Sequence, residues 1–147
     1  MKTADLPVKL FLTVTYIVMV ATNYLANALP LNGIQTGEVS DSYPNLFAPA
    51  GITFSIWGLI YLLLAIHLLH QWGLFHRVGA NNGAVLRKVA VLFAATSLAN
   101  TAWVFSWHYD FIFVSTVLIA TILVLLAVIA VTLRDYPLPG QIGRAHV

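Results

Sequence analysis

Charged side chains divide the chain into apolar stretches that have the length of membrane-spanning helices. Four stretches contain no Asp, Glu, Lys or Arg, and they cover residues 10–29, 49–71, 89–107 and 111–133. A helix needs ~20 residues, at 1.5 Å each, to cross about 30 Å of hydrocarbon. The last stretch is aliphatic over most of its length, and we expect it to face lipid. The pattern predicts an all-α fold, a polytopic transmembrane helical bundle with four spans.

The charges between these stretches alternate from one connection to the next. The N-terminal end carries two lysines, residues 30–48 carry only acidic side chains, and residues 72–88 carry only basic ones. The short 109–110 turn is acidic, and the C-terminal end carries arginines again. Lys and Arg are retained in cytoplasmic loops. We therefore predict a multi-pass integral membrane protein with a cytoplasmic N-terminus. As a separate expectation, we place it in a bacterial cell membrane.

Composition supports a single membrane domain. Of 147 residues, 60% are hydrophobic and 8% are charged, whereas a soluble domain has about 25% charged residues. The longest connection, residues 30–48, is too short for a separate soluble domain, so we expect one transmembrane domain over residues 1–140. Loop asymmetry explains the basic excess, and we expect no nucleic-acid partner. The chain has no cysteine, which excludes disulfides and thiolate chemistry.

The C-terminal residues have an unusual sequence. Residues 142–147 (IGRAHV) match the translation of a widely used sequencing adapter. We interpret residues 141–147 as a non-native read-through tail. We also expect the reading frame to be truncated, with further helices following in the full-length protein.

Three of the predicted helices combine polar groups with flat aromatic rings on one face, at the spacing of three to four residues that aligns side chains on a helix. The residues are Asn23 and Asn27 in the first helix, Phe54, Trp57 and Tyr61 in the second, and Asn100, Trp103 and Trp107 in the third. In one reading, the asparagines join helices through hydrogen bonds worth ~0.6 kcal/mol on average. In the other, these faces line a pocket for a large, flat, mostly apolar ligand. Spacing alone favours the first reading.

Metal binding and catalysis have weak support in the sequence. His67, His70 and His76 cluster toward one end of the second helix, but that helix has no Cys, Asp or Glu to complete a coordination shell. We therefore expect interfacial histidines and no metal site. No nucleophile–base pair stands at helical spacing, and no Gly-rich phosphate loop is present. We expect no enzymatic activity.

Two segments resemble the TspO/MBR family, which comprises the tryptophan-rich sensory proteins of bacteria and the mitochondrial translocator protein. The segments are residues 47–61 (FAPAGITFSIWGLIY) and 99–107 (ANTAWVFSW). The family has a long loop after its first helix, a proline-rich entry to its second and an N-x-x-W motif in its third. The matching residues are Phe47, Pro49, Phe54, Trp57, Gly58, Tyr61, Asn100 and Trp103. The chain lacks the family's second proline, the tryptophan after Pro-Pro-Gly and any tryptophan in the long loop.

The resemblance implies a bundle of five or more helices with a ligand pocket that opens toward the 30–48 loop. In that family the pocket binds porphyrins, sterol-like lipids and synthetic aromatic drugs. The residues we expect to bind ligand here are Asn23, Asn27, Phe47, Pro49, Phe54, Trp57, Tyr61, Asn100, Trp103 and Trp107.

The function expected from the resemblance is binding or transport of a tetrapyrrole, such as a porphyrin, or of a sterol-like lipid. We expect no cofactor other than a porphyrin acting as ligand, contact with membrane lipid, and a homodimer as a candidate assembly. The first alternative is a structural or sensory subunit that contacts a partner protein. The second is an enzyme acting on a tetrapyrrole or lipid through Asp41 or His108.

Overall fold

The computed structural model describes residues 4–29, 31–34, 36–42, 56–74 and 83–134. All regular elements in these residues are helical, which confirms the predicted all-α bundle. In chain order they are α1 (Leu6–Ala28), the 3₁₀ turn η1 (Leu31–Gly33), α2 (Thr36–Asp41), α3 (Ile56–Gln71), α4 (Gly83–His108) and α5 (Ile112–Arg134).

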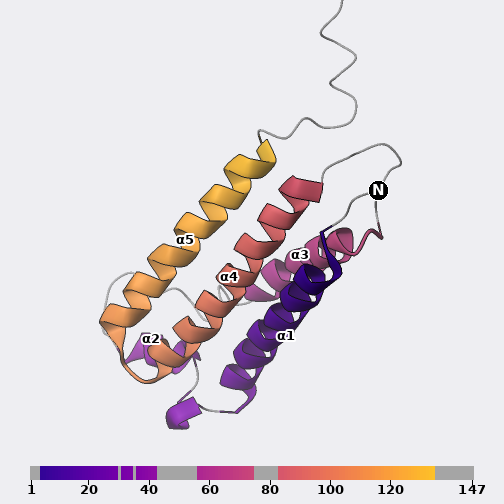
Figure 1. The fold of residues 1–147 in the computed structure, drawn as a ribbon. Helices are drawn as coiled ribbons and strands as arrows, with labels where there is room; N and C mark the ends of the chain where they lie inside the picture. The colour runs from indigo at the N-terminus through magenta and orange to yellow at the C-terminus, as the bar shows by residue number, and fades with distance from the viewer. Residues whose placement is uncertain (1–3, 30, 35, 43–55, 75–82, 135–147) are drawn as a thin grey trace, which may run out of the picture.

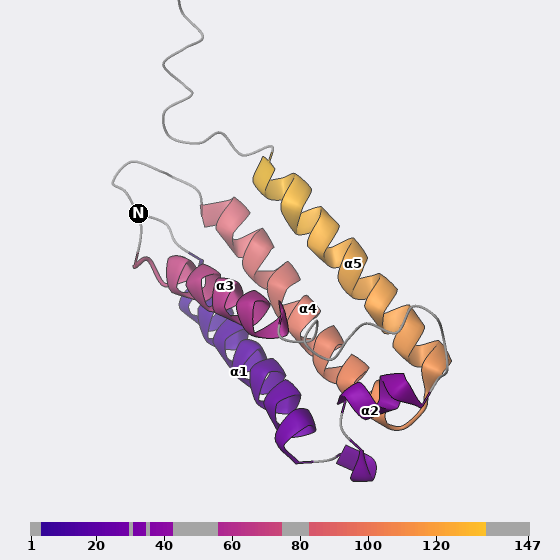
Figure 2. The same ribbon diagram turned by 180° about the vertical axis from the view of Figure 1, so that it is seen from behind.

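Helix α4 is the centre of the bundle. It packs extensively against α5 on one side and α1 on the other (Figure 1). Helix α3 lies beside α1, and the view from behind shows it crossing α1 and α4 at an angle (Figure 2). Helix α2 contacts α4 near its C-terminal end. The long 30–48 connection therefore contains two short helical segments placed over one end of the bundle.

Three helices are long and apolar enough to cross a membrane: α1 with the turn that follows it, α4 and α5. Helix α3 is apolar but has only 16 residues in the described part, and the predicted start of this span at Pro49 lies outside the described residues. Helices α1 and α4 begin at Leu6 and Gly83, earlier than the predicted residues 10 and 89. The stretches without charged residues correspond only to the part of each helix in the hydrocarbon layer. The helices themselves continue into the headgroup region, where charged side chains are solvated.

Proline residues in the sequence explain where α1 begins and ends. Pro7 stands in the first turn, where a helix does not need the missing backbone N–H. At the other end, Leu29 is extended, with φ −120° and ψ 116°. A residue that precedes proline favours this conformation, and Pro30 comes next in the sequence.

Helices α3 and α4 end in the same hydrogen-bonded motif. At the end of α4, the Phe111 N–H donates to the Ser106 carbonyl at 2.9 Å and the Asp110 N–H donates to the Trp107 carbonyl at 3.4 Å. Asp110 has φ 58°, a left-handed conformation that Asp tolerates better than most residues. Gly73, at φ 94°, has the equivalent position after α3. The tight turn at Asp110 makes α4 and α5 antiparallel neighbours.

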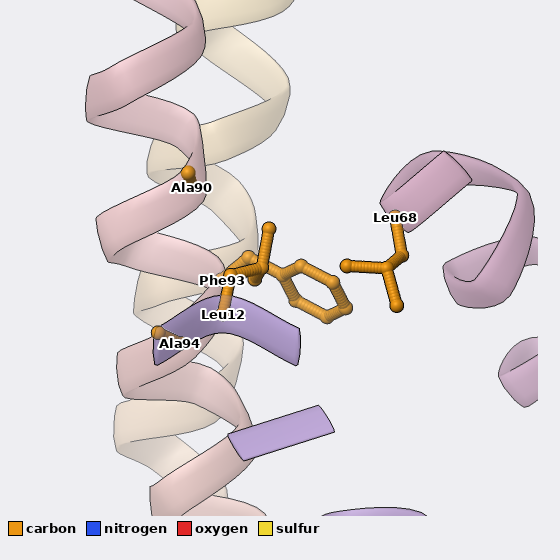
Figure 3. Packing of buried hydrophobic residues seen from close by; sticks show 5 residues of the cluster. All are labelled: Leu12, Leu68, Ala90, Phe93 and Ala94. Carbon is orange, nitrogen blue, oxygen red and sulfur yellow. The ribbon is translucent and has the colours of Figure 1, made fainter. Parts of the chain in front are cut away.

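Buried apolar side chains fill one half of the bundle. Leu12, Leu68, Ala90, Phe93 and Ala94 form a buried cluster in which the Phe93 ring projects from α4 toward α3 (Figure 3). The two alanines on α4 let neighbouring helices approach closely, as small residues do in membrane bundles. This half contains the N-terminal parts of α1 and α4.

Helix α5 exposes most of its side chains. Among its residues only Ser115 and Ile122 are buried, and most of the exposed residues are large and apolar. Exposed aliphatic surface of this extent is unfavourable in water and suited to lipid. The expectation that this helix faces lipid agrees with the structure.

Candidate functional site

A cavity of about 330 Å³ lies in the half of the bundle away from the apolar core. Helices α1, α3 and α4 form its walls, and α2 contributes one residue. The lining residues are Val20, Asn23, Tyr24, Asn27, Thr36, Trp57, Gly58, Tyr61 and Trp103. Its volume lies at the lower end of the roughly 300–1,000 Å³ of small-molecule sites.

Four aromatic rings form a continuous stack along this cavity, which we call the aromatic ladder. The Tyr61 ring stacks on Trp57 at a centroid distance of 6.2 Å, and Trp57 stacks on Trp103 at 6.1 Å. Trp103 stacks in turn on Trp107 at 6.2 Å, with 20° between the ring planes. The stripes predicted on two separate helices therefore meet across the α3–α4 interface. Offset stacking at these distances is a favourable arrangement of aromatic rings.

A pair of asparagines connects α1 to α4 beside the same cavity. Asn23 Nδ2 donates to Asn100 Oδ1 at 2.7 Å and to the Met19 carbonyl at 2.8 Å. Asn100 is buried, whereas Asn23 lines the cavity. Asn27 Nδ2 donates to the Asn23 carbonyl, and Asn27 also lines the cavity. Both interpretations of the asparagines thus have structural support. The Asn23–Asn100 bond joins two helices, and Asn23 also lines the cavity.

Tyr61 has a buried hydroxyl without a hydrogen-bond partner in the described part of the protein. Its backbone carbonyl, in contrast, accepts a hydrogen bond from the Tyr16 hydroxyl at 2.8 Å. Leaving a buried donor unsatisfied costs roughly 1–3 kcal/mol. An orphaned hydroxyl on a cavity-lining residue is therefore a candidate contact for a polar atom of a ligand.

The segments η1 and α2, which we call the cap segment, are tied to the C-terminal end of α4. Asn32 Nδ2 donates to the His108 carbonyl at 3.0 Å, and the Trp107 indole N–H donates to the Thr36 carbonyl at 3.4 Å. His108 is 1% exposed, and its Nδ1 lies 2.8 Å from the Val104 carbonyl. Since a carbonyl accepts, Nδ1 carries the proton, and Nε2 accepts from the Thr36 hydroxyl at 3.4 Å. We call these hydrogen bonds between the cap segment and α4 the latch. Thr36 therefore belongs both to the latch and to the cavity wall.

The predicted site residues fall into three groups in the structure. Asn23, Asn27, Trp57, Tyr61 and Trp103 line the cavity. Asn100 and Trp107 lie behind them and support Asn23 and Trp103. The remaining three, Phe47, Pro49 and Phe54, lie outside the described residues.

Sequence reasoning missed several contributors. Val20, Tyr24 and Thr36 line the cavity, and His108, which the sequence suggests only as a catalytic candidate, anchors the cap segment. Helical spacing gives a weak signal for these residues. Val20 and Asn27 are seven residues apart on α1 and share a face, and His108 directly follows the predicted Trp107. The latch could not be found this way, because it depends on how the loop folds back over α4.

The histidines of α3 lie at the opposite end of the bundle from the cavity. The His67 and His70 rings stack with centroids 6.5 Å apart, and the His67 and Phe93 rings lie edge to face with centroids 5.5 Å apart. Gln71 is fully buried and donates from Nε2 to the Leu86 carbonyl. The described residues hold no group of three or more His, Cys, Asp or Glu that could bind a metal ion. His76 lies outside the described residues.

An all-helical bundle with several membrane-length apolar helices and an aromatic cavity between them has the architecture of an integral membrane protein. The family model for TSPO-like proteins matches residues 9–142. The chain therefore belongs to the TSPO-like protein family, which confirms the TspO/MBR resemblance of its motifs. No curated protein and no solved structure matches the chain significantly.

Proposed function

We propose that this membrane protein binds a flat, mostly apolar ligand in the cavity and carries or senses it without chemical conversion. The ligand class is a tetrapyrrole or a sterol-like lipid. The observation that carries the proposal is the aromatic ladder, with Trp57 and Trp103 stacked in the cavity wall next to the orphaned hydroxyl of Tyr61.

Each part of the wall has a distinct role in this proposal. The tryptophan rings offer flat apolar surface on which an aromatic or fused-ring ligand gains stacking and burial. The amides of Asn23 and Asn27 and the hydroxyl of Tyr61 orient the ligand through its polar atoms. Such a ligand needs at least one hydrogen-bonding group on an otherwise apolar body.

Cavity size bears on how the two ligand classes would bind. At about 330 Å³, the cavity suits a ligand of drug size. A sterol-like body is narrow, so we propose that its fused rings enter this space while its tail stays outside. A porphyrin is broader, so we propose that one edge of the macrocycle enters beside Trp57 while the remainder extends toward the cap segment.

Tryptophan fluorescence provides the test, because the four tryptophans are divided between the two ends of the bundle. Trp57, Trp103 and Trp107 belong to the ladder, whereas Trp72 donates its indole N–H to Thr13 beyond the end of α3. Fifteen residues separate Trp57 from Trp72, about 22 Å along a helix. Purified protein should show saturable quenching by protoporphyrin IX.

The variant Trp103→Ala should weaken protoporphyrin affinity about tenfold or more, since stacking and burial of one large ring contribute roughly 1.5–3 kcal/mol. Trp72→Phe is the matched control, and it should leave the dissociation constant unchanged. Absence of saturable quenching in the wild type would exclude the tetrapyrrole version, and a sterol should then be tested by ligand-dependent thermal stabilisation. Obligate co-purification with another membrane protein, without stabilisation by either ligand, would instead favour the partner-contacting subunit.

The charge pattern leads us to propose an orientation as well. The basic end, with Lys9, Arg87 and Arg134, would face the cytoplasm of a bacterial cell, and the acidic cap segment would face outward. Ligand would then reach the cavity from the outer side or from the outer leaflet of the membrane.

A further inference from the structure

A second pocket lies on the outer surface of α4, at the basic end of the bundle. It is a shallow, largely open depression lined by Ala84, Arg87, Lys88, Val91 and Leu92, all of which belong to α4. Ala84, Lys88 and Val91 follow the i, i+4, i+7 spacing of one helical face, and all three are exposed. The pocket shares no lining residue with the ligand cavity.

The position of these residues along α4 matches the depth of a lipid headgroup. Twenty residues separate Lys88 from His108 at the opposite end, which is about 30 Å of helix and equals the thickness of the hydrocarbon layer. When Trp107 and Tyr109 lie at one interface, as aromatic belts do, Arg87 and Lys88 lie at the other. Val91 and Leu92 are one turn deeper and reach the acyl chains.

The charge at this site favours an anion. Arg87 and Lys88 are adjacent, exposed and basic, and Lys9 and Arg134 are at the same end of the bundle. Arg87 Nη1 forms an ion pair with Asp5 Oδ2 at 3.6 Å. Both of its side chains are more than 60% exposed, so the pair is weak and a phosphate can compete with it. No ion pair to Lys88 is formed by the described residues.

We propose that this pocket is a binding site for an anionic phospholipid. Its phosphate is held by Lys88 and Arg87, and one acyl chain lies along Val91 and Leu92. A basic pair directly above apolar side chains complements both parts of such a lipid, whereas a soluble anion would use the charges alone. The site is independent of the proposed ligand cavity and survives if that function is wrong.

The experiment compares phosphatidylglycerol with phosphatidylcholine, added as defined lipids to the purified full chain in neutral detergent. Phosphatidylglycerol should raise the thermal unfolding temperature at lower concentration than phosphatidylcholine does. Lys88→Gln should weaken the phosphatidylglycerol effect about fivefold, because one basic side chain at an anionic membrane surface contributes roughly 1 kcal/mol. The double variant Arg87→Gln/Lys88→Gln should abolish the preference over phosphatidylcholine.

Lys9→Gln is the matched control, since it removes one positive charge at the same end but lies over the Trp72 ring, 5.6 Å from its centroid, and outside the pocket. It should retain most of the preference. Equal effects of Lys88→Gln and Lys9→Gln would overturn the proposal, because they would indicate a general surface potential. The same conclusion would follow if both lipids acted equally, or if soluble glycerol phosphate stabilised the protein as well as the lipid.

Discussion

Two tyrosine-to-phenylalanine substitutions should change stability in opposite directions. The Tyr61 hydroxyl is buried without a partner among the described residues, whereas the Tyr16 hydroxyl donates to the Tyr61 carbonyl at 2.8 Å. Each substitution removes one oxygen atom and keeps the ring. The pair therefore isolates the hydrogen-bonding state of each hydroxyl from packing.

The expected changes in unfolding free energy follow from the cost of burying a hydroxyl without a hydrogen-bond partner and from the value of a hydrogen bond between helices. Tyr61→Phe removes a hydroxyl whose burial costs roughly 1–3 kcal/mol, so the ligand-free protein should become about 1 kcal/mol more stable. Tyr16→Phe removes a bond between α1 and α3 and should cost about 0.6 kcal/mol, the average for such bonds in membranes. If the ligand bonds to Tyr61, Tyr61→Phe should also weaken its binding about fivefold, which corresponds to one hydrogen bond of about 1 kcal/mol.

The assay is reversible unfolding of the full chain in mixed micelles, measured by circular dichroism with and without protoporphyrin IX. Circular dichroism avoids the fluorescence that the ligand quenches. Destabilisation of the ligand-free protein by Tyr61→Phe would show that the hydroxyl has a partner. Unchanged ligand affinity in that variant would show that the ligand does not contact Tyr61, and the assigned role of this residue would be wrong.

Three further predictions concern the cavity, its cap and the topology. A Cβ at Gly58, or at Gly37 on α2, would meet no heavy atom within 4 Å. Gly58→Leu should therefore fold yet block ligand quenching, because Gly58 lines the cavity, whereas Gly37→Leu should bind normally. Glu38 is the only glutamate in the sequence, so cleavage by a glutamate-specific protease reports on release of the cap segment. His108→Leu removes the side-chain bond to Thr36 but keeps the backbone contact of Asn32, and it should accelerate cleavage several-fold over wild type. An unchanged rate would show that the His108 side chain does not hold the cap segment. Reporter fusions after Glu38 and after Lys88 should give opposite locations, and a shared location would exclude the proposed orientation.

The sequence predicts the helices of this protein well because one physical constraint dominates. Lipid accepts neither charges nor unpaired backbone groups, so apolar length alone indicates where α1, α4 and α5 lie. The sequence places the starts of α1 and α4 too late, because Lys9, Arg87 and Lys88 have the charge expected of residues in connections. A long side chain can belong to a helix and still reach the headgroups.

The candidate site was predictable only in part. Helical spacing placed Asn100 and Trp103 on one face and Trp57 and Tyr61 on another. It could not show that Trp57 would stack on Trp103, because that depends on how α3 crosses α4. The family resemblance supplied the expectation of a pocket. The orphaned hydroxyl of Tyr61 and the latch at His108 became visible only from the packed structure.

The antiparallel pairing of α4 and α5 has a consequence for biogenesis. Helix α4 carries most of the buried polar side chains, including Thr96, Ser97 and Asn100, whereas α5 is almost entirely aliphatic. A segment with this polar content partitions less readily from the translocon on its own, and a strongly apolar helix that begins after three intervening residues compensates for it. We therefore expect the two helices to enter the bilayer as one hairpin, with α5 supplying the driving force that places α4 in the membrane.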